Sequence, residues 1–396
     1  MRRIVFLNRS YWPEEPATAQ LLTDLAEALA ADGKDVTVIT SRPGGSGLPR
    51  SHTHRGVVIW RVRCTRWARL GLPGKAVDFL TFYVGALGQL LFTARRGDNV
   101  VALTDPPLLG VGAWLAARLC GARVFHWVQD IYPEIAAVLT GQHWLRAISP
   151  LRDLAWRRSD GCVTLGSDMA AILARAGVSA EKIILSPNWA PAGLGGMPHN
   201  ATDALRAAWG LEGKFIVAYS GNLGRVHDLG PVLDLAEALR SETAIAFVFI
   251  GDGARRAALE AQAGKRALAN LHFHPSQPRA GLAAALALGD LHLVTLRPGC
   301  EAFVFPSKLY GVAAVGRPVI FIGPRDCEIA RLVEQRGLGR AFARDEVASI
   351  AATIRQWHAE PGRLAPLAAA ATAFGRDHSG PAQATVAWER LLATAD

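Results

Sequence analysis

The sequence predicts an α/β protein made of two doubly wound parallel sheets. At 396 residues, the chain is longer than one ordinary hydrophobic core accommodates, which predicts two domains. Short apolar runs alternate with amphipathic helical segments, and this alternation restarts near residue 214. Half of the residues are apolar and 19% are charged, which is a globular composition and excludes a disordered chain.

The first half opens with a strand–helix–strand unit. Residues 4–7 form an apolar run, the polar loop 8–18 follows, and residues 20–31 place leucines on one helical face. Gly33 ends this helix, and 35–40 is the next strand. Repetition of such units covers both faces of a parallel sheet with helices. Further strands are expected at 57–62, 100–104, 124–128 and 161–165.

The second half repeats the pattern after a stretch rich in Pro and Gly, residues 187–199, which is the best linker candidate. Its strands are expected at 215–219, 246–250, 271–273, 291–295 and 319–322, with a helix at 230–239. We therefore divide the chain into an N-terminal domain, 1–188, and a C-terminal domain, 189–379. A last helix at about 380–396 has the length to cross back to the first domain, which the sequence alone leaves open.

The net charge and the cysteines limit which binding partners and which cellular compartment we expect. The net charge is +9, and residues 1–190 carry 22 Lys and Arg against 15 Asp and Glu. The first half should therefore face an anion, and nucleic acid, anionic lipid and a polyphosphate acceptor all fit. Five scattered cysteines without CxxC spacing suggest a reducing compartment and no metal cluster. We expect neither a signal peptide nor a transmembrane helix, because no apolar run reaches 18 residues.

Several ordered motifs together resemble one enzyme family. They are YWPEEPATAQ, TDPPLL, QDIYPEIA, SPNWAP, YSGNLGRVHDL, FIGDG and FPSKLYGVAAVGRPVIFIG. In this order and spacing, the chain resembles the bacterial group 1 glycosyltransferases of retaining family 4. Within them it is similar to the branch that builds lipopolysaccharide, capsule and exopolysaccharide.

The resemblance implies the GT-B fold, in which two Rossmann-like domains face each other across a cleft. It also implies transfer from a nucleotide diphosphate sugar, with a UDP-sugar favoured, to a polyprenyl-diphosphate-linked or saccharide acceptor. Family enzymes react on one face of the sugar, and the departing phosphate helps to remove the acceptor proton. The sequence shows no DxD motif for a metal at the diphosphate. We therefore expect a metal-independent enzyme with no cofactor besides its donor substrate.

The donor phosphates are expected at the loop after strand 215–219. A loop between a strand and a helix offers backbone amides and a helix N-terminus to an anion. Its candidate binding residues are Gly221, Asn222, Gly224, Arg225 and His227. The resemblance implies an Arg at position 222 and a Lys at position 227. Since Asn222 and His227 stand there, Arg225 is expected to supply charge instead. The alternative is a tight strand–helix turn without a ligand.

A second donor segment surrounds Lys308. This lysine precedes an apolar helix, 309–315, where a positive charge is unfavourable unless an anion binds. We therefore predict that Ser307 and Lys308 contact phosphate or sugar, the alternative being a surface lysine.

The family's pair of glutamates is broken in this chain. The resemblance places them at Phe303 and Gly311, neither of which carries a charge. Glu301 lies two residues from the first position and is the candidate acid toward the sugar. Gly311 keeps the place of the ribose-binding glutamate, and Glu328 is the second candidate for the ribose.

The acceptor is expected at strand ends of the first half. Glu14 or Glu15 lies in the loop after the first strand, and Asp130 follows strand 124–128. Where the resemblance implies His-Asp, this chain has Gln129-Asp130. We name Asp130, Glu301 and Glu14 as the catalytic candidates. Further candidates are Glu134 and Asp105, whereas His126 is expected to be a packed core residue.

Residues 55–96 predict a membrane surface. Arginines and two tryptophans precede an apolar helix at 76–94, and Arg95-Arg96 closes it. Such a segment is typical of an interfacial helix on anionic lipid. We expect a cytoplasmic enzyme peripheral to the inner face of the cytoplasmic membrane. A buried crossover helix beside a solvated basic loop is the alternative.

Two other functions of the same fold stay open. A nucleotide-sugar epimerase shares the donor site but needs acid and base side chains at the sugar, and Gln129 argues against it. A non-catalytic nucleotide-sugar-binding subunit accounts for the broken glutamate pair. Nucleic-acid binding fits the charge, but the sequence contains no recognisable module for it.

Overall fold

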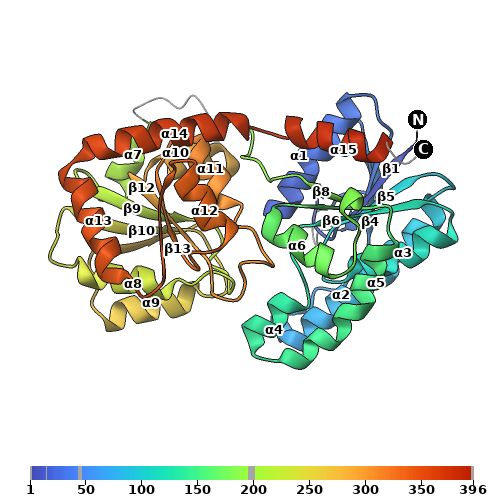
Figure 1. Ribbon diagram of the computed structural model, residues 1–396, viewed down its shortest axis with the longest axis horizontal. Helices are drawn as coiled ribbons and strands as arrows, with labels where there is room; N and C mark the ends of the chain where they lie inside the picture. Colours follow the sequence, from blue (N-terminus) through green and yellow to red (C-terminus); the bar gives the residue numbers. More distant parts are fainter. Residues whose placement is uncertain (1, 15, 43–46, 195–200, 394–396) are drawn as a thin grey trace. The chain divides into compact units, whose positions relative to one another are not determined.

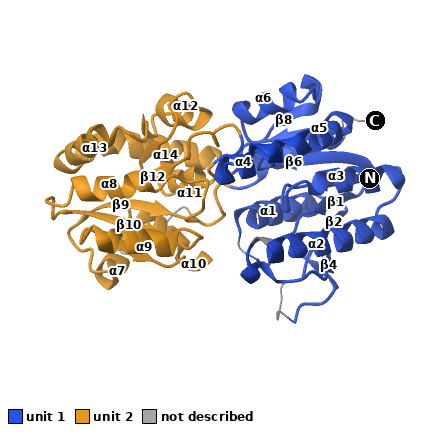
Figure 2. Ribbon diagram, turned by 90° about the horizontal axis from the view of Figure 1, so that it is seen from below, with its two compact units in different colours: residues 1–188, 303–305, 380–396 blue, residues 189–302, 306–379 orange. Residues whose placement is uncertain are grey.

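The computed structural model describes residues 2–14, 16–42, 47–194 and 201–393. The chain forms two compact units, coloured separately in Figure 2. Unit 1 comprises 1–188, 303–305 and 380–396, and unit 2 comprises 189–302 and 306–379. Glu15 and residues 195–199 of the expected linker lie outside the described residues.

Segment 303–305 is assigned differently from the sequence prediction, which placed it in the second domain. It groups with unit 1 because its backbone pairs with residues of that unit. The Ile131 amide donates to the Phe303 carbonyl at 2.9 Å, and Asp130 forms a β-bridge with Val304. An irregular segment without apolar periodicity carries no sequence signal for such a pairing.

Unit 1 contains an eight-stranded sheet in the order β3-β4-β2-β1-β5-β6-β7-β8. All neighbours pair in parallel except β3 with β4. Its inner strands are buried along their length, as strands covered on both faces must be. The strands are β1 (Ile4–Leu7), β2 (Val36–Ser41), β3 (Ser51–His54), β4 (Val57–Val62), β5 (Asn99–Ala102), β6 (Arg123–Val128), β7 (Gly161–Thr164) and β8 (Ile183–Leu185).

Unit 2 contains a six-stranded parallel sheet in the order β11-β10-β9-β12-β13-β14. Its apolar strands are buried along their length, as in β10, which has the sequence IAFVFI. The strands are β9 (Phe215–Ser220), β10 (Ile245–Ile250), β11 (Leu271–His274), β12 (Leu291–Thr295), β13 (Val319–Ile322) and β14 (Gly339–Phe342).

Helices connect these strands in both units (Figure 1). Those of unit 1 are α1 (Ala17–Ala31), α2 (Leu72–Thr93), α3 (Leu109–Leu119), α4 (Glu134–Thr140), α5 (Ser149–Arg158), α6 (Ser167–Arg175) and α15 (Ala382–Ala393), with short 3-10 helices η1 (Ala68–Leu70), η2 (His143–Ile148) and η3 (Ala180–Lys182). Those of unit 2 are α7 (Ala201–Ala208), α8 (Gly230–Ala238), α9 (Arg256–Lys265), α10 (Arg279–Ala287), α11 (Lys308–Ala314), α12 (Glu328–Gln335), α13 (Val347–Ala359) and α14 (Leu364–Asp377), with the 3-10 helix η4 (Pro361–Arg363).

Both sheets have a topological switch point, which confirms the predicted doubly wound fold. In unit 1 the strand order reverses between β1 and β5, and in unit 2 between β9 and β12. In such sheets ligands bind outside the carboxyl ends of the strands at this point. The polar loops after β1 and β9 are therefore placed where a ligand is expected.

The last helix, α15, packs on unit 1, although it follows the helices of unit 2 in sequence. Trp388 is fully buried, and its ring meets Phe6 and Trp127 edge-on, with centroids 6.1 and 5.4 Å away. Glu389 forms an ion pair of 3.0 Å with Lys34, which lies in the turn between α1 and β2. Helix α15 thus completes the core of the unit that also contains the N-terminus.

We expect Trp388→Ala to destabilise unit 1 by about 3–5 kcal/mol, because the large cavity left under α15 cannot fully collapse. The measurement is urea unfolding followed by circular dichroism. Val386→Ala is the matched control, since Val386 lies on the same helix with 47% of its surface exposed. Equal effects of the two substitutions would contradict this role of α15.

Candidate functional site

The loop after β9 is shaped by close backbone packing against the GDG motif. The Gly221 amide donates to the Ile250 carbonyl, and the Leu223 amide donates to that of Asp252, both at 2.9 Å. A Cβ atom at Gly251 would lie 2.1 Å from the Gly221 carbonyl oxygen, so only glycine fits there. The GDG motif therefore supports the loop, and Gly221 itself has a φ of +119°.

This loop presents backbone amides that have no protein partner. The amides of Asn222, Gly224 and Arg225 donate no hydrogen bond to another described residue. Asn222 and the Arg225 side chain are exposed, whereas Gly224 is buried. Unpaired amides in a loop between a strand and a helix form an anion-binding site.

Lys308, the first residue of α11, reaches this loop from another part of unit 2. Its ammonium Nζ donates to the Tyr219 hydroxyl and lies 3.8 Å from the centre of that ring. The same Nζ lies 3.4 Å from His227 Nε2. The Tyr219 hydroxyl donates in turn to the Asn222 carbonyl at 3.1 Å. The structure therefore brings together three of the predicted donor residues, Asn222, His227 and Lys308.

The Lys308 ammonium has neutral neighbours. Burial lowers the pKa of Lys308 well below its ordinary value. Burial, and then the positive charge of Lys308, lower the pKa of His227 to about 3, so this imidazole is neutral at pH 7. No carboxylate of a described residue lies within ion-pair distance of Lys308. An anionic ligand gains the most binding free energy where it pairs with a desolvated cation that has no other counterion.

Two other donor candidates, Gly311 and Ser307, lie in or next to α11 and make none of these contacts. Gly311 is buried inside α11, where a Cβ atom would lie 3.3 Å from Leu286 Cδ1. A side chain there would require the end of Leu286 to shift by a few tenths of an ångström, and glycine itself supplies no carboxylate for the ribose. Ser307 is the partly buried residue before α11, and its side chain makes no capping hydrogen bond.

The two candidate donor acids differ in their environment. Glu301 is partly buried, and its Oε2 atom is buried without a hydrogen-bond partner among the described residues. Glu328 is the first residue of α12. It lies close enough to Tyr310 for its charge to add to the effect of burial in raising the pKa of that tyrosine. The roles of both carboxylates toward the donor stay predictions.

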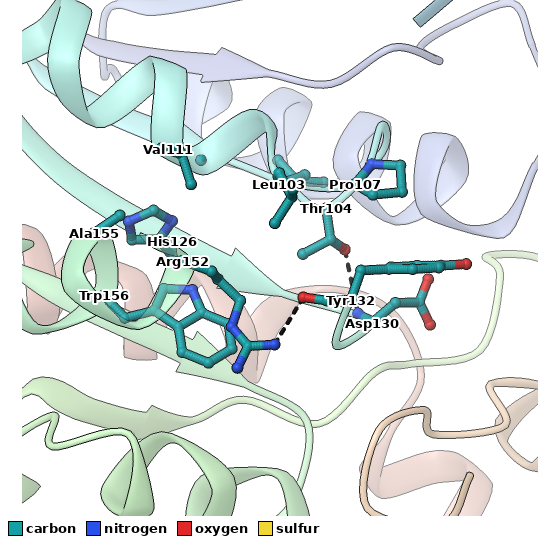
Figure 3. A pocket seen from close by; sticks show the side chains of 12 residues that line it. Leu103, Thr104, Pro107, Val111, His126, Asp130, Tyr132, Arg152, Ala155 and Trp156 are labelled. Carbon is teal, nitrogen blue, oxygen red and sulfur yellow. Dashed lines mark hydrogen bonds between the residues drawn. The ribbon is translucent and has the colours of Figure 1, made fainter. Parts of the chain in front are cut away.

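In unit 1, acceptor candidates lie at the carboxyl ends of neighbouring strands. Asp130 follows β6, and Thr104 follows β5. The Asp130 amide donates to Thr104 Oγ1 at 3.2 Å. It lines a pocket with mostly apolar walls between α3 and α5 (Figure 3). In this view Asp130 and Tyr132 lie at one end of the pocket, and His126 and Trp156 lie at the other.

Three carboxylates near these strand ends affect one another. Burial, and then the charge of Asp105, raise the pKa of Asp130 to about 6. Burial also raises the pKa of Glu14, whose Oε2 atom is buried without a hydrogen-bond partner. Asp105 itself is paired with Arg9 Nε at 3.1 Å. Asp130 and Glu14 are therefore the two carboxylates of this group whose pKa is raised.

Glu134 makes structural contacts with α5, and its acceptor role stays a prediction. It forms an ion pair with Arg152 and accepts a hydrogen bond of 2.9 Å from the Ser149 hydroxyl. Arg152 also donates to the Tyr132 carbonyl at 2.7 Å. Glu134 thereby joins the start of α4 to α5. Gln129, which replaces the histidine implied by the resemblance, pairs with Asn188 at 3.2 Å.

Sequence reasoning missed three residues of these sites. Tyr219 is the next-to-last residue of the apolar strand β9 and resembles a core residue, and Thr295 is the last residue of β12. Arg9 lies in a polar loop and shows its role only through its pairing with Asp105. The position of each residue at the carboxyl end of a strand is the one signal that marks it. Among the described residues, no group of three or more His, Cys, Asp and Glu is arranged to hold a metal ion.

Two family patterns match the chain. The family described as "Glycosyl transferase 4-like domain" matches residues 18–189, and "Glycosyl transferases group 1" matches residues 201–374. The putative colanic acid biosynthesis glycosyl transferase WcaI of Escherichia coli K12 is 30% identical over 381 residues, which are 89% of this chain and 91% of that protein.

Solved structures share the fold. The structure of Anabaena Alr3699/HepE in complex with UDP-glucose has a TM-score of 0.77 at 16% identity, over 100% of both chains. Sucrose-phosphate synthase of Thermosynechococcus elongatus has a TM-score of 0.80 at 15% identity, over 99% of this chain and 98% of the other. Both likenesses extend over the two units, and the expected GT-B fold is confirmed.

We expect Asp130→Asn to stabilise the protein above about pH 6 and to have little effect near pH 4. Because folding raises the pKa of Asp130 from its ordinary value of 3.8 to about 6, the buried charge lowers stability progressively as the pH rises from about 4 to about 6, and the full loss remains above pH 6. Thermal unfolding at several pH values measures this difference. The control is Glu212→Gln, which removes an exposed carboxylate. A pH-independent effect of Asp130→Asn would contradict the burial of a titrating Asp130.

Proposed function

Because this chain belongs to the group 1 glycosyltransferases, we propose that it moves a sugar from a nucleotide diphosphate sugar to a lipid-linked or saccharide acceptor in cell-surface polysaccharide biosynthesis. The observation that carries this proposal is the Lys308 ammonium, which has neutral partners and adjoins a loop with unpaired amides. The name of the colanic acid relative supports the class of product.

The donor diphosphate would bind at the loop after β9. The amides of Asn222, Gly224 and Arg225 would donate to its oxygens, and Lys308 would supply the compensating charge. The exposed Arg225 side chain adds a second cation beside the loop. A UDP-sugar is the favoured donor, and the UDP-glucose complex of HepE makes it the first one to test.

The proposed reaction retains the configuration of the sugar and needs no divalent metal. The bond between the anomeric carbon and the phosphate oxygen breaks while the acceptor oxygen attacks on the same face, and the acceptor proton passes to the departing phosphate. Lys308 and the loop amides would stabilise the charge that develops on this phosphate. The protein then contributes mainly orientation and electrostatics, which requires no covalent nucleophile.

On the acceptor side, Asp130 and Glu14 would hold the attacking hydroxyl. A carboxylate with a pKa of about 6 is ionised at pH 7 yet basic enough to accept a strong hydrogen bond from an alcohol. The Arg9 guanidinium, paired with Asp105, limits the negative charge next to Asp130. Glu301, with an unpartnered oxygen, is the proposed acid toward the donor sugar.

We also propose that unit 1 binds the cytoplasmic face of the membrane. Large apolar side chains are exposed on a series of neighbouring elements, because α2 packs against η1 and α3, α3 against α5, and α5 against η2. We call this set the apolar surface. Its residues are Trp67, Leu70, Leu80, Val84, Leu91, Phe92, Leu115, Leu119, Trp144, Ile148 and Leu151.

Exposed arginines and a lysine accompany the apolar surface. None of them forms a salt bridge with another described residue. They are Arg63, Arg66, Arg69, Lys75, Arg95, Arg96, Arg118, Arg146, Arg157 and Arg158. Unpaired cations next to exposed aromatic and aliphatic side chains favour anionic lipid as the partner. This surface extends beyond the predicted residues 55–96 to α3, η2 and α5.

Helix α2 binds to the surface of the bilayer in this proposal. By length and composition, Pro73–Thr93 qualifies as a membrane span, with a mean hydropathy of 1.4, although sequence analysis expected no such helix. However, Phe82, Ala86 and Leu90 are fully buried against strands and α3 of unit 1. Leaving the unit would expose this core, so we propose an interfacial position for α2.

We expect label from one nucleotide sugar to enter the lipid fraction of a membrane extract in the presence of EDTA. The donors to compare are UDP-, GDP-, dTDP- and ADP-sugars. Lys308→Met should lower kcat/KM about 100-fold or more, as the loss of a charge-stabilising donor does. Lys265→Met is the matched control, because Lys265 is an exposed lysine of the same unit.

Other outcomes separate the alternatives. Conversion of the donor sugar without an acceptor would support an epimerase, and nucleotide binding without any turnover would support a binding subunit. A requirement for added metal would contradict the proposed role of Lys308. If no nucleotide sugar binds or reacts, the donor site is wrong.

We expect the protein to float with phosphatidylethanolamine vesicles only when they contain phosphatidylglycerol. Phe92→Asp and Leu119→Asp should each weaken this binding about tenfold or more, because burying such a side chain contributes about 1.5–3 kcal/mol. These side chains are 92% and 82% exposed. Leu185→Asp is the control at an exposed leucine outside the apolar surface. Equal flotation of all variants would contradict the proposed surface.

A further inference from the structure

We propose that His227 is a positioning residue for the donor, which holds the Lys308 ammonium at the anion-binding loop through its Nε2 atom. The sequence predicts His227 as a direct ligand of the donor instead. The side chain is only 8% exposed, and both of its ring nitrogens face protein groups. This inference rests on the proposed function, because it assumes that the loop binds the donor diphosphate.

The hydrogen bond to Thr295 fixes which nitrogen of His227 carries the proton. His227 Nδ1 lies 2.8 Å from the Thr295 carbonyl oxygen, which is an acceptor only. Nδ1 must therefore be the donor in the neutral ring, and Nε2 is left with a lone pair. That lone pair faces the Lys308 ammonium at 3.4 Å, with the geometry of an acceptor for a positively charged donor.

Tyr219 supplies the second contact that holds the lysine. Its hydroxyl proton is directed to the Asn222 carbonyl, so the hydroxyl oxygen is free to accept from Lys308. Tyr219 is 1% exposed and packs edge-on against Phe249, which fixes the ring. Two of the three ammonium N–H bonds are thereby assigned, and the third is available to the ligand.

A lysine needs such support because its side chain is long and flexible. Restricting its rotatable bonds costs conformational entropy, which would otherwise oppose donor binding. A Cβ atom at Gly221 would lie 3.7 Å from Lys308 Cε, so the end of the lysine chain runs next to the loop backbone. His227 and Tyr219 therefore fix the charge beside the amides before the donor arrives, and both partners are uncharged and do not compete with the phosphates.

Two substitutions of His227 separate its two contacts. Asn keeps a side-chain N–H at the position of Nδ1, which can still donate to Thr295, but it has no atom at the position of Nε2. Gln reaches the position of Nε2 with an oxygen that can accept from Lys308. We expect His227→Asn to raise the Kd for UDP about tenfold, as the loss of one hydrogen bond to a charged group does. His227→Gln should recover part of this loss.

A double-mutant cycle with Lys308→Met tests whether His227 acts through the lysine. UDP binding is measured by calorimetry for the wild-type chain, His227→Asn, Lys308→Met and the double variant. We expect His227→Asn to have no further effect when Lys308 is already Met. Circular dichroism and thermal unfolding check that each variant is folded, and His143→Asn, an exposed histidine outside the site, is the control.

The outcomes distinguish this inference from the proposed function. If the wild-type chain binds UDP and His227→Asn binds it equally well, or weakens binding by the same factor with and without Lys308, the positioning role is wrong while the donor site stands. If the wild-type chain binds neither UDP nor GDP, dTDP or ADP, the proposed function fails first.

Discussion

The donor side of this protein depends on one unbalanced charge, the Lys308 ammonium at the start of α11. Its contacts are a tyrosine hydroxyl, an aromatic ring and a neutral imidazole, and none of these carries a negative charge. Burial disfavours the protonated amine, and an arriving diphosphate would reverse that penalty. The surrounding groups can be understood as supports for this charge: Thr295 orients His227, Asn222 orients Tyr219, and the GDG motif fixes the loop whose amides stay unpaired.

The two sheets explain why these groups meet. Tyr219 and Thr295 lie in the carboxyl-terminal parts of neighbouring strands, β9 and β12, at the point where the strand order of unit 2 reverses. In unit 1 the same arrangement places Glu14 after β1, Asp105 after β5 and Asp130 after β6. The carboxyl ends of parallel strands all lie at the same edge of the sheet, so residues far apart in sequence are neighbours there. Burial at that edge is also what raises the pKa of Asp130 and Glu14.

The strands with a strong local pattern could be predicted from the sequence. Features that depend on contacts between residues far apart in the chain could not. Residues 57–62, 291–295 and 319–322 were located to the residue, because each of these buried strands is dominated by apolar and β-branched side chains. Strand β14, with the sequence GRAF, has only two buried residues and no such signal. Motif order indicated Lys308 and the loop at 221–225, but not their contact. The link through Tyr219 and His227 joins residues more than 80 positions apart, and no local pattern encodes it.

The central claim is that Lys308 and the amides of the loop after β9 bind the donor diphosphate. The most direct test is a crystal structure of the protein with UDP. We expect phosphate oxygens within hydrogen-bond distance of Lys308 Nζ and of the amides of Asn222, Gly224 and Arg225, with His227 still bound to the Thr295 carbonyl. A diphosphate bound elsewhere, with Lys308 in contact only with Tyr219 and His227, would contradict it.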